Sequence, residues 1–589
     1  MTVATDPITA EIIRGALVSI TAEMKTNLMR TAYNLIIYEA QDFTVGLFDA
    51  NGDAISIGLG LPMFVGGLSD AVKAKLDFYG PGGIEPGDIL LTNDPDIMGS
   101  HLNHMIFTLP IFAGGELIAF ASSMAHWVDI GGVLGGTTTD IYAEGVQVPI
   151  VKIFKRGVQD DELTRTIAAN VRFPELAMGD LRAQIAAVRT GESRMVALCE
   201  RYGTDAVLSS IRDMYDRSEA LARRAVAEIP DGVYTAETRM DDDGVATGVP
   251  VPIKVSVIVE GDQLTIDLGE VSPQVGGYFN SGATAGRSAA QVAFKCLTSP
   301  DLFPVNAGSF RPVRVDLPPG RVVSARKPAA MRWWMTYPMS VVDCVFRALA
   351  GVLPGGIAGH HADLALTNMY GRDPDDGAFF MFRYGPQGGG WGALPDKDGE
   401  SATVAINDGD THNTPVEALE AKHPGQQVER YALRPDSGGP GRRRGGLGTE
   451  LVIRTHAPAA LNAFIERTTQ PPWGLDGGGA AAPNGVRVIR GDGTEERFAN
   501  GKLDGYRLDA GDAYVVTTGG GGGYGDPLER PAGDVLADVR NGYVTAAAAF
   551  DAYGVVIRDG DTGPDLDAER TRREREIRRD PNPASEGNR

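Results

Sequence analysis

The sequence predicts a mixed α/β protein of the α+β class, with several layers of helices and mixed or antiparallel sheets and no single doubly wound sheet. Three observations support this fold class. The stretches at 43–58 and 105–123 have the pattern of β-hairpins with tight turns. Residues 161–227 are mostly helical in pattern, and short alternating strands begin at about residue 232.

The N-terminal part begins with a helix. Asp6 followed by proline is a helix start, and apolar residues then recur at helical spacing from Ile13 to Leu28. We expect this amphipathic helix to end at about Thr31. The first hairpin follows around an Asn-Gly turn, and a short helix at 68–78 precedes the second hairpin.

The rest of the chain alternates strands with returning helices. Helical patterns recur after residue 232, and a Gly/Pro-rich stretch at 434–447 introduces a β-rich region that extends to about residue 518. The expected helices are at 288–297, 339–353, 535–540 and 546–553. Four parts are expected: 1–230 with the second hairpin, a mixed part at 231–433, a β-rich part with closing helices at 434–560, and a charged flexible tail at 561–589.

Composition excludes several classes of function. A net charge of −22 argues against binding to nucleic acid or to anionic membrane surfaces, because both need patches of Lys and Arg. No apolar run approaches the roughly 18 residues of a membrane span, and the N-terminus does not have the pattern of a signal peptide. Three widely spaced cysteines predict no disulfide framework, so we expect a cytoplasmic protein.

The strongest candidate for chemistry is a cluster of histidines. Three of the eight histidines of the chain, His101, His104 and His126, lie close together in sequence, and Asp129 follows them. Histidine is the commonest transition-metal ligand and the side chain most easily used for proton transfer near neutral pH. Nitrogen and carboxylate ligands without a nearby cysteine pair favour Zn, Mn or Fe. The alternative is a set of scattered polar residues near a sheet edge.

The second hairpin brings both ends of this cluster together. A two-residue turn in its Gly-Gly sequence would place His104 opposite Ala125, whereas a three-residue turn would place it opposite His126. Either register puts the two ends of the segment at the open end of the hairpin. Residues three apart point to opposite faces of a strand, so His101 or His104 is expected to lie in the preceding loop.

Other residues give weaker signals. Asp94 lies ahead of His101 in an Asn-Asp-Pro sequence and could bind a metal or orient a ligand, although the sequence is also ordinary turn chemistry. Glu144 could orient a metal-bound ligand or lie in a surface turn. The adjacent His360 and His361 point in different directions in any regular structure, so this pair predicts no site.

The run GGGGGYGDP at 519–527 is the most conspicuous glycine motif. A phosphate-binding loop would need a Gly-x-x-x-x-Gly-Lys-Ser/Thr string, which occurs nowhere in the chain. We therefore expect a conformationally demanding loop, and the chain by itself is not expected to bind ATP. Arg434 could hold a carboxylate or carbonyl group, but its Gly/Pro surroundings favour a rigid turn.

Six motifs follow one another along the chain: YEAQDFTVGLFD, TNDPDIMGSHLNH, SMAHWVDIGG, RPDSGGPGRRRGGLG, QPPWGLDGGG and GGGGYGDPLERP. Together they resemble the hydantoinase B family, and the likeness runs from about residue 8 to residue 556. This family supplies the second large subunit of ATP-dependent N-methylhydantoinases, 5-oxoprolinases and caprolactamases, and of acetone and acetophenone carboxylases.

The resemblance implies a hetero-oligomer. A partner, the hydantoinase A subunit with an actin- or sugar-kinase-like ATPase fold, would bind ATP and Mg and phosphorylate a cyclic amide or ketone substrate. The family's metal motif, His-x-x-Asp followed by a second His, maps onto His101, His104 and His126, with Asp129 beside them. His104 departs from this motif, because the family usually has Asp there. Three histidines make the site less anionic and favour Zn or Fe over Mn.

The mechanism implied by the resemblance is metal-assisted ring opening. One divalent metal on the three histidines, with Zn favoured, would activate water, and Asp129 would orient a histidine ring or accept the proton. Asp94 and Glu144 complete the expected catalytic set. The expected reaction is hydrolysis of a cyclic amide that the partner has phosphorylated. A subunit of a ketone carboxylase and a non-catalytic scaffold are the alternatives.

Overall fold

The computed structural model describes residues 6–80, 82–133, 136–298, 305–353, 355–356, 358–361, 363, 365–373, 376–407, 409, 415–423, 425–560 and 563–579. The chain forms two compact units, Met1–Ala348 with Ile406–Asn413 and Leu349–Ala405 with Thr414–Arg589. The expected boundaries near residues 230 and 433 do not coincide with this division. They remain predictions of smaller domains within the two units. The strands between residues 232 and 316 belong to the same compact unit as the histidine hairpin.

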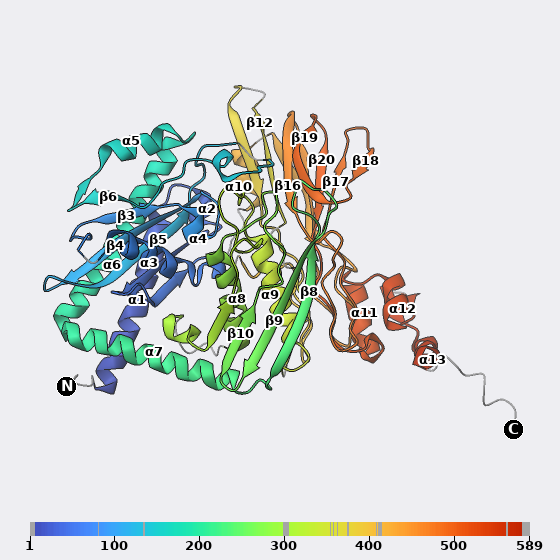
Figure 1. Ribbon diagram of the computed structural model, residues 1–589. Coiled ribbons are helices and arrows are strands. Elements are labelled where there is room, and N and C mark those ends of the chain that lie inside the picture. Colours follow the sequence, from blue (N-terminus) through green and yellow to red (C-terminus); the bar gives the residue numbers. More distant parts are fainter. Residues whose placement is uncertain are drawn as a thin grey trace. The chain divides into compact units, whose positions relative to one another are not determined.

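The first unit contains a seven-stranded antiparallel sheet with the order β2-β1-β5-β4-β3-β6-β7 (Figure 1). Its strands are β1 (Phe43–Asp49), β2 (Ala54–Leu59), β3 (Ile89–Thr92), β4 (His104–Ala113), β5 (Glu116–His126), β6 (Val151–Lys155) and β7 (Val158–Gln159). Both predicted hairpins are confirmed, as β1–β2 and β4–β5. Because β4 and β5 lie in the middle of the sheet, almost all their residues are buried.

The helices before residue 350 include the predicted N-terminal helix, which the Asp6 side chain caps by accepting from the Ile8 and Thr9 backbone N–H groups. They are α1 (Pro7–Thr31), α2 (Leu35–Tyr38), α3 (Gly67–Tyr79), α4 (Pro95–Met98), α5 (Asp161–Ala169), α6 (Pro174–Tyr202), α7 (Thr204–Val226), α8 (Ala283–Thr298) and α9 (Thr336–Leu349). Among all the helices that the structure describes, none has the length and apolar character needed to cross a membrane.

Different helices cover the two faces of the seven-stranded sheet. α1 and α6 pack on one face, where Gly191 of α6 lies against Ala121 of β5. α3 packs on the other face, where Lys75 Nζ donates to Thr108 Oγ1 of β4 (2.8 Å). His104 precedes Thr108 by four residues on the same strand, so its side chain faces the α3 side of the sheet.

A second, smaller sheet of the first unit has the order β11-β10-β9-β8. Its strands are β8 (Gly232–Met240), β9 (Val251–Glu260), β10 (Gln263–Asp267) and β11 (Val313–Asp316). β8, β9 and β10 are antiparallel, and β11 adds a parallel edge strand, so this sheet is mixed. The α+β class with mixed and antiparallel sheets is therefore confirmed.

The second unit contains a sandwich of two antiparallel sheets, with the orders β13-β12-β16-β19 and β14-β15-β20-β17-β18. Apolar residues of both sheets share one core. The strands are β12 (Leu366–Arg372), β13 (Phe379–Tyr384), β14 (Gln426–Leu433), β15 (Thr449–Thr455), β16 (Ala459–Ile465), β17 (Gly485–Ile489), β18 (Glu495–Arg497), β19 (Gly501–Leu508) and β20 (Ala513–Thr517). Helix α10 (Val416–Lys422) precedes β14.

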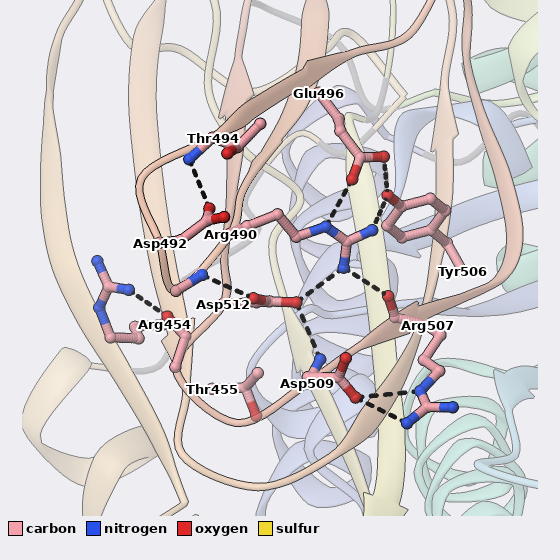
Figure 2. Close-up of polar contacts among 12 residues, drawn as sticks. Arg454, Thr455, Arg490, Asp492, Thr494, Glu496, Tyr506, Arg507, Asp509 and Asp512 are labelled. Carbon is pink, nitrogen blue, oxygen red and sulfur yellow. Dashed lines mark hydrogen bonds and ion pairs between the residues drawn. The ribbon is translucent and has the colours of Figure 1, made fainter.

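A polar network at one end of the sandwich connects its two sheets (Figure 2). Arg490, directly after β17, donates to Glu496 of β18 (2.6 Å) and to Asp512, just before β20 (2.8 Å). The Tyr506 hydroxyl of β19 contacts both Arg490 and Glu496. Because each of these charged groups has a partner of opposite charge, we assign this network a structural role.

Five glycine-rich segments of the second unit form what we call the glycine bundle: 358–361, 389–393, 437–448, 472–481 and 519–525. Backbone hydrogen bonds join the last segment to each of the other four. Two of these bonds run from Gly521 N to Gly446 O (2.9 Å) and from Gly522 N to Gly359 O (2.7 Å). The backbones can approach this closely because few side chains separate them.

Space, rather than a torsion angle, requires glycine in this run. A Cβ atom at Gly521 would lie 1.8 Å from the carbonyl oxygen of Trp391, and one at Gly522 would lie 1.8 Å from that of Trp473. None of Gly519–Gly523 is among the described glycines with positive φ. The run is therefore a loop without regular secondary structure, as expected from the sequence, but it is buried in the second unit and its glycines are required by space.

The C-terminal helices are α11 (Ala532–Arg540), α12 (Ala546–Tyr553) and α13 (Ala568–Arg579), with a small hairpin of β21 (Ile557–Gly560) and β22 (Gly563–Leu566). α11 and α12 confirm the predicted closing helices. α13 differs from the flexible tail expected there, because arginines anchor it: Arg575 donates to Tyr553 O (2.9 Å) and Arg578 to Asp551 O (2.7 Å). The end of the expected tail, 580–589, lies outside the described residues.

Candidate functional site

The open end of the β4–β5 hairpin brings polar side chains together from three adjacent strands. His104 begins β4 and pairs with His126, the last residue of β5. β1 lies on the other side of β5, and the backbone N–H of His126 donates to the carbonyl oxygen of Asp42, directly before β1 (3.0 Å). Asp42, His126 and His104 therefore occupy neighbouring positions across the sheet.

The register of this hairpin combines the two predicted alternatives. At the tip, Ala113 pairs with Glu116, as a two-residue turn requires. A β-bulge next to the tip then leaves Ile118 of β5 without a paired residue and shifts the register by one. Below the bulge His104 faces His126, which is the pairing expected for a three-residue turn. The bulge, not the turn, makes the two histidines face each other.

The three histidine rings form a compact, buried group. Their centroids are 4.5 Å apart for His101 and His104, 4.8 Å for His101 and His126, and 5.4 Å for His104 and His126. His101 lies in the loop between α4 and β4, as the spacing of three predicted. Gly99, in the left-handed region with φ of 74°, ends α4 and turns the chain there. The structure thus brings together the three residues predicted as metal ligands.

Both ring nitrogens of His104 have hydrogen-bond partners. Nε2 lies 3.1 Å from Asp42 Oδ1, and Nδ1 lies 2.8 Å from Ser100 Oγ. An ionised carboxylate only accepts, so Nε2 of His104 carries a proton in this arrangement. Asp42 was not predicted from the sequence. Its sequence signals are its place in the motif YEAQDFTVGLFD and its position directly before the first hairpin, and its pairing with the cluster depends on β1 lying beside β5.

His101 has one engaged nitrogen and one without a hydrogen-bond partner. Nδ1 lies 3.0 Å from the carbonyl oxygen of Arg332, so Nδ1 donates. Nε2 is buried and has no hydrogen-bond partner among the described residues. Burial, reinforced by the neighbouring His104 and His126, lowers the pKa of His101 well below its usual value. A neutral ring with its lone pair on Nε2 is the form in which histidine binds metals.

Two aromatic rings border the histidines. Phe64, in the short helix η1 (Pro62–Phe64), places its ring 5.0 Å from that of His104 in an edge-to-face arrangement. The Trp334 ring lies 5.9 Å from His104 and 6.4 Å from His101. These side chains add to the low polarity around the cluster, and that low polarity disfavours a charged imidazole.

Asp129, predicted to orient a histidine ring or to accept a proton, has its carboxylate bound to Arg172. Its carboxylate accepts from the guanidinium of Arg172 (2.6 Å) and from the backbone N–H of the same residue, rather than from a histidine ring. The reason is local, because β5 ends at His126 and the chain then leaves the sheet as a loop toward Arg172. The carboxylate that contacts a histidine ring is that of Asp42.

Glu144 lies at the end of the short helix η2 (Ile141–Ala143) and is buried. Its Oε1 accepts from the backbone N–H groups of Met331 and Arg332 (both 2.9 Å) and from Thr138 Oγ1 (2.8 Å). Oε2 is buried without a hydrogen-bond partner among the described residues. Burial raises the pKa of Glu144 to about 7. Glu144 therefore contacts the segment that binds His101 rather than the histidines themselves.

Asp94 contacts the same distant segment. Its side chain caps α4 by accepting from the Asp96 N–H (3.0 Å), and it forms an ion pair with Lys327 (2.7 Å). The predicted set of Asp94, Glu144 and Asp129 thus surrounds the histidines without touching their rings. Sequence reasoning missed the segment around Lys327 and Arg332, which lies some 200 residues from the histidines and has no motif of its own.

The weaker candidates have structural roles in the second unit. Arg434 Nη1 donates to the carbonyl oxygens of Pro483 (2.7 Å) and Thr518 (3.1 Å), as suits an anchored turn. His361 Nε2 donates to Thr403 O (3.1 Å), and burial lowers the pKa of His361 to about 3. A neutral histidine bonded to a backbone carbonyl is typical of a core residue.

The histidine cluster has suitable donors for a metal but not a closed coordination geometry. Within the described ranges, no three His, Cys, Asp or Glu side chains are grouped as they stand so that they could hold a metal ion. The donors fit Zn or Fe in kind, since three imidazoles and one carboxylate meet in a buried position. His104 Nε2 could serve as a ligand only by giving up its hydrogen bond to Asp42.

Comparisons with known proteins point to one family. The family profile described as Hydantoinase B/oxoprolinase matches residues 6–527. The chain is 34% identical to the beta subunit of the caprolactamase of Pseudomonas jessenii, over 94% of this chain and 96% of that protein. It is 30% identical to the B subunit of a putative D-/L-hydantoinase of Pseudomonas sp. (strain NS671), over 97% of this chain and 98% of that one.

Two solved structures resemble this chain along nearly its whole length. The crystal structure of the ATP-dependent caprolactamase from Pseudomonas jessenii matches with a TM-score of 0.90 at 30% identity, over 98% of this chain and 100% of that chain. An acetone carboxylase structure matches with a TM-score of 0.85 at 20% identity, over 98% of this chain and 83% of that chain. The second match is a likeness of fold alone.

Proposed function

This chain belongs to the hydantoinase B/oxoprolinase family, and we propose that it is the B subunit of an ATP-dependent enzyme that hydrolyses a cyclic amide. The observation that carries the proposal is similarity along nearly the whole chain to subunits named for a caprolactamase and a hydantoinase. The substrate class is accordingly a lactam or a cyclic imide.

We place ATP and Mg on a partner, an A-type ATPase subunit, with which this chain forms a cytoplasmic hetero-oligomer. Two observations support this division. The relatives are named as the B and beta subunits of their enzymes, and the chain contains no phosphate-loop string. In this scheme the partner phosphorylates the amide oxygen, and this chain carries out ring opening.

We further propose that one divalent metal, with Zn favoured, binds to His101, His104 and His126. The metal would supply Lewis acidity and make water acidic enough to attack at neutral pH. His101 is prepared for this role by its available Nε2. The metal and Asp42 would compete for Nε2 of His104, because this nitrogen is already hydrogen-bonded to Asp42.

The residues of the chain would hold and orient the reacting groups. Asp42 is the carboxylate next to the histidines, so we assign to it, rather than to Asp129, the proton that water loses on attack. Phe64 and Trp334 keep bulk water away from the histidine rings. Asp129, bound to Arg172, fixes the loop that follows β5.

Metal analysis and turnover test this proposal together. The chain is produced with an A-type ATPase subunit and assayed for ATP-dependent opening of hydantoin, 5-oxoproline and caprolactam. We expect bound metal in the wild type and a loss of metal and at least about a hundredfold lower turnover in His101→Ala and His126→Ala. His456→Ala, at an exposed position of the second unit, is the matched control and should change neither.

Two outcomes would decide against this function. An absence of metal in the wild type, with unchanged turnover in both histidine variants, would leave the chain as a scaffold for the ATPase. ATP consumption that requires bicarbonate and a ketone would identify a carboxylase instead.

A further inference from the structure

Side chains near the histidine cluster converge on one distant stretch of chain, residues 327–334, which we call the clamp segment. Asp94 binds the start of this segment through an ion pair, and Glu144 binds its backbone. His101 contacts the carbonyl oxygen of Arg332 in the same segment. Asp94, Glu144 and His101 thus all bind the clamp segment, to which we assign no catalytic side chain.

We propose that Glu144 is a positioning residue that holds the backbone at Arg332, so that the Arg332 carbonyl keeps the proton of His101 on Nδ1 and leaves Nε2 available to the site. The use made of Nε2 rests on the proposed function. The tautomer itself does not, since it is a property of the chain without metal, substrate or partner.

The contacts of Glu144 support this role. One carboxylate oxygen accepts from two consecutive backbone N–H groups, those of Met331 and Arg332, at 2.9 Å each. Two consecutive N–H groups bound to one atom fix the peptide between Met331 and Arg332. The Arg332 carbonyl belongs to the next peptide, whose N–H, that of Trp333, donates to Tyr278 O (2.9 Å). Glu144 therefore acts on this carbonyl by holding Arg332 itself. That carbonyl, of Arg332, is the one that meets His101. Thr138 completes the arrangement by donating to the same oxygen of Glu144 (2.8 Å).

The contact at His101 determines the tautomer. A backbone carbonyl can only accept, so the nitrogen 3.0 Å from Arg332 O must carry the proton. A neutral imidazole has one N–H, so Nε2 then holds the lone pair. In metal sites, a bond from the second ring nitrogen to a carbonyl or carboxylate commonly fixes the orientation of the ligand in this way.

Other contacts hold the start of the clamp segment independently of Glu144. Lys327 pairs with Asp94 (2.7 Å), and the Ile141 N–H donates to Pro328 O (2.9 Å). Asn280 Nδ2 donates to Ala330 O (3.1 Å). Removal of the Glu144 carboxylate should therefore free the Met331–Arg332 peptide without releasing the whole segment.

The test is an NMR measurement on the full-length chain labelled with [15N]histidine, which reports which ring nitrogen carries the proton. The signals of His101 are identified by their loss in His101→Gln. In the wild type we expect a proton on Nδ1 and none on Nε2. In Glu144→Ala we expect a mixture of both tautomers and an affinity for Zn²⁺ that is about 10–100-fold weaker.

Glu144→Gln separates positioning from charge. An amide oxygen can accept from the same two backbone N–H groups, so we expect the tautomer of the wild type and a Zn²⁺ affinity within about threefold of it. Asp512→Ala is the matched control, because Asp512 of the second unit is also a buried carboxylate that accepts from two backbone N–H groups, those of Gly491 and Asp509. This control should lower stability and leave the tautomer of His101 unchanged.

Several results would overturn the inference. They are a proton on Nε2 of His101 in the wild type, an unchanged tautomer in a folded Glu144→Ala, and the same mixture in Asp512→Ala. If Glu144→Ala does not fold, the wild type and Glu144→Gln still decide. An inactive wild-type complex that shows the expected tautomer would count against the proposed function and support the positioning role.

Discussion

At the histidine end of the seven-stranded sheet, side chains from two strands, a loop and the residue before a third strand meet in the interior of the first unit. In the glycine bundle of the second unit, five backbone segments meet with few side chains between them. The first region depends on which functional groups are present. The second depends on the absence of a Cβ atom.

The difference teaches how to interpret a conspicuous residue in a sequence. A histidine cluster points to chemistry because imidazole does something that few other side chains can do. A glycine run can point to a turn, to a ligand loop or to close packing, and composition does not separate these three. In this chain the run at 519–527 is close packing, since its neighbours are other backbones at distances that exclude a side chain.

The largest expected effect is in the glycine bundle. Gly521→Ala would place a Cβ atom 1.8 Å from Trp391 O, and backbone surrounds the position on both sides. We expect a loss of more than about 4 kcal/mol in the free energy of unfolding, or failure to fold. Denaturant unfolding of the second unit measures it. Near-normal stability would show that the segments of the bundle can move apart to admit a side chain.

The next effect concerns pH and Glu144. Its pKa rises from the ordinary value of 4.5 to about 7, so between these values the folded state binds the proton more tightly than the unfolded chain. The contribution of Glu144 to stability is therefore greatest at low pH and is lost as the pH rises to about 7. Relative to Glu144→Gln, wild-type stability should fall by about 2–3 kcal/mol from pH 4.5 to pH 7.5. If the unfolding free energies of the two proteins change in parallel with pH, this prediction is wrong.

A smaller effect is expected at Asp42, which orients the ring of His104 through Nε2. Asp42→Asn keeps the size of the side chain but weakens that bond, and we expect about 10–100-fold lower ATP-dependent turnover with little change in unfolding temperature. Asp129→Asn serves as the comparison, because that carboxylate binds Arg172 instead of a histidine. If Asp129→Asn proves the more damaging of the two for turnover, the assignment of the carboxylates must be exchanged.

The smallest effect tests glycine where nothing crowds it. Gly533 lies in α11, has no heavy atom within 4 Å of the place that a Cβ atom would take, and is not among the described glycines with positive φ. Gly533→Ala should stabilise the protein by up to about 1 kcal/mol. Thermal unfolding of Gly533→Ala and Gly521→Ala measures the two changes in stability. A large loss of stability in both variants would remove the distinction between crowded and open glycines.

Much of the site could be predicted from local patterns. The hairpin, the three histidines and the loop position of His101 all follow from residues within one short stretch of chain, where spacing and alternation determine geometry. Asp42 could not be predicted, since its position depends on the pairing of β1 with β5. The clamp segment around Arg332 was also out of reach, because no rule of spacing connects it to His101.

The fold shows the same limit. Individual helices and hairpins follow from periodicity, as α1 and the β1–β2 hairpin do. The association of five glycine segments does not, since each contact joins parts of the chain that are distant in sequence. Arg575 and Arg578 look like the exposed charges of a tail in the sequence, yet they bind carbonyl oxygens around α12.

The bulge at Ile118 determines which residues face each other at the far end of the hairpin. His104 lies roughly 20 Å along the strand from the bulge, at about 3.3 Å per residue. At unchanged chain length, pairing without the bulge would continue the register of the tip and place His104 opposite Ala125, with His104 and His126 on different faces of the sheet. Deletion of Ile118 itself would remove the extra residue together with the bulge and leave His104 opposite His126. The histidine cluster therefore tolerates loss of the bulge only together with loss of Ile118, so the register near the tip and the spacing of the histidines must be inherited together.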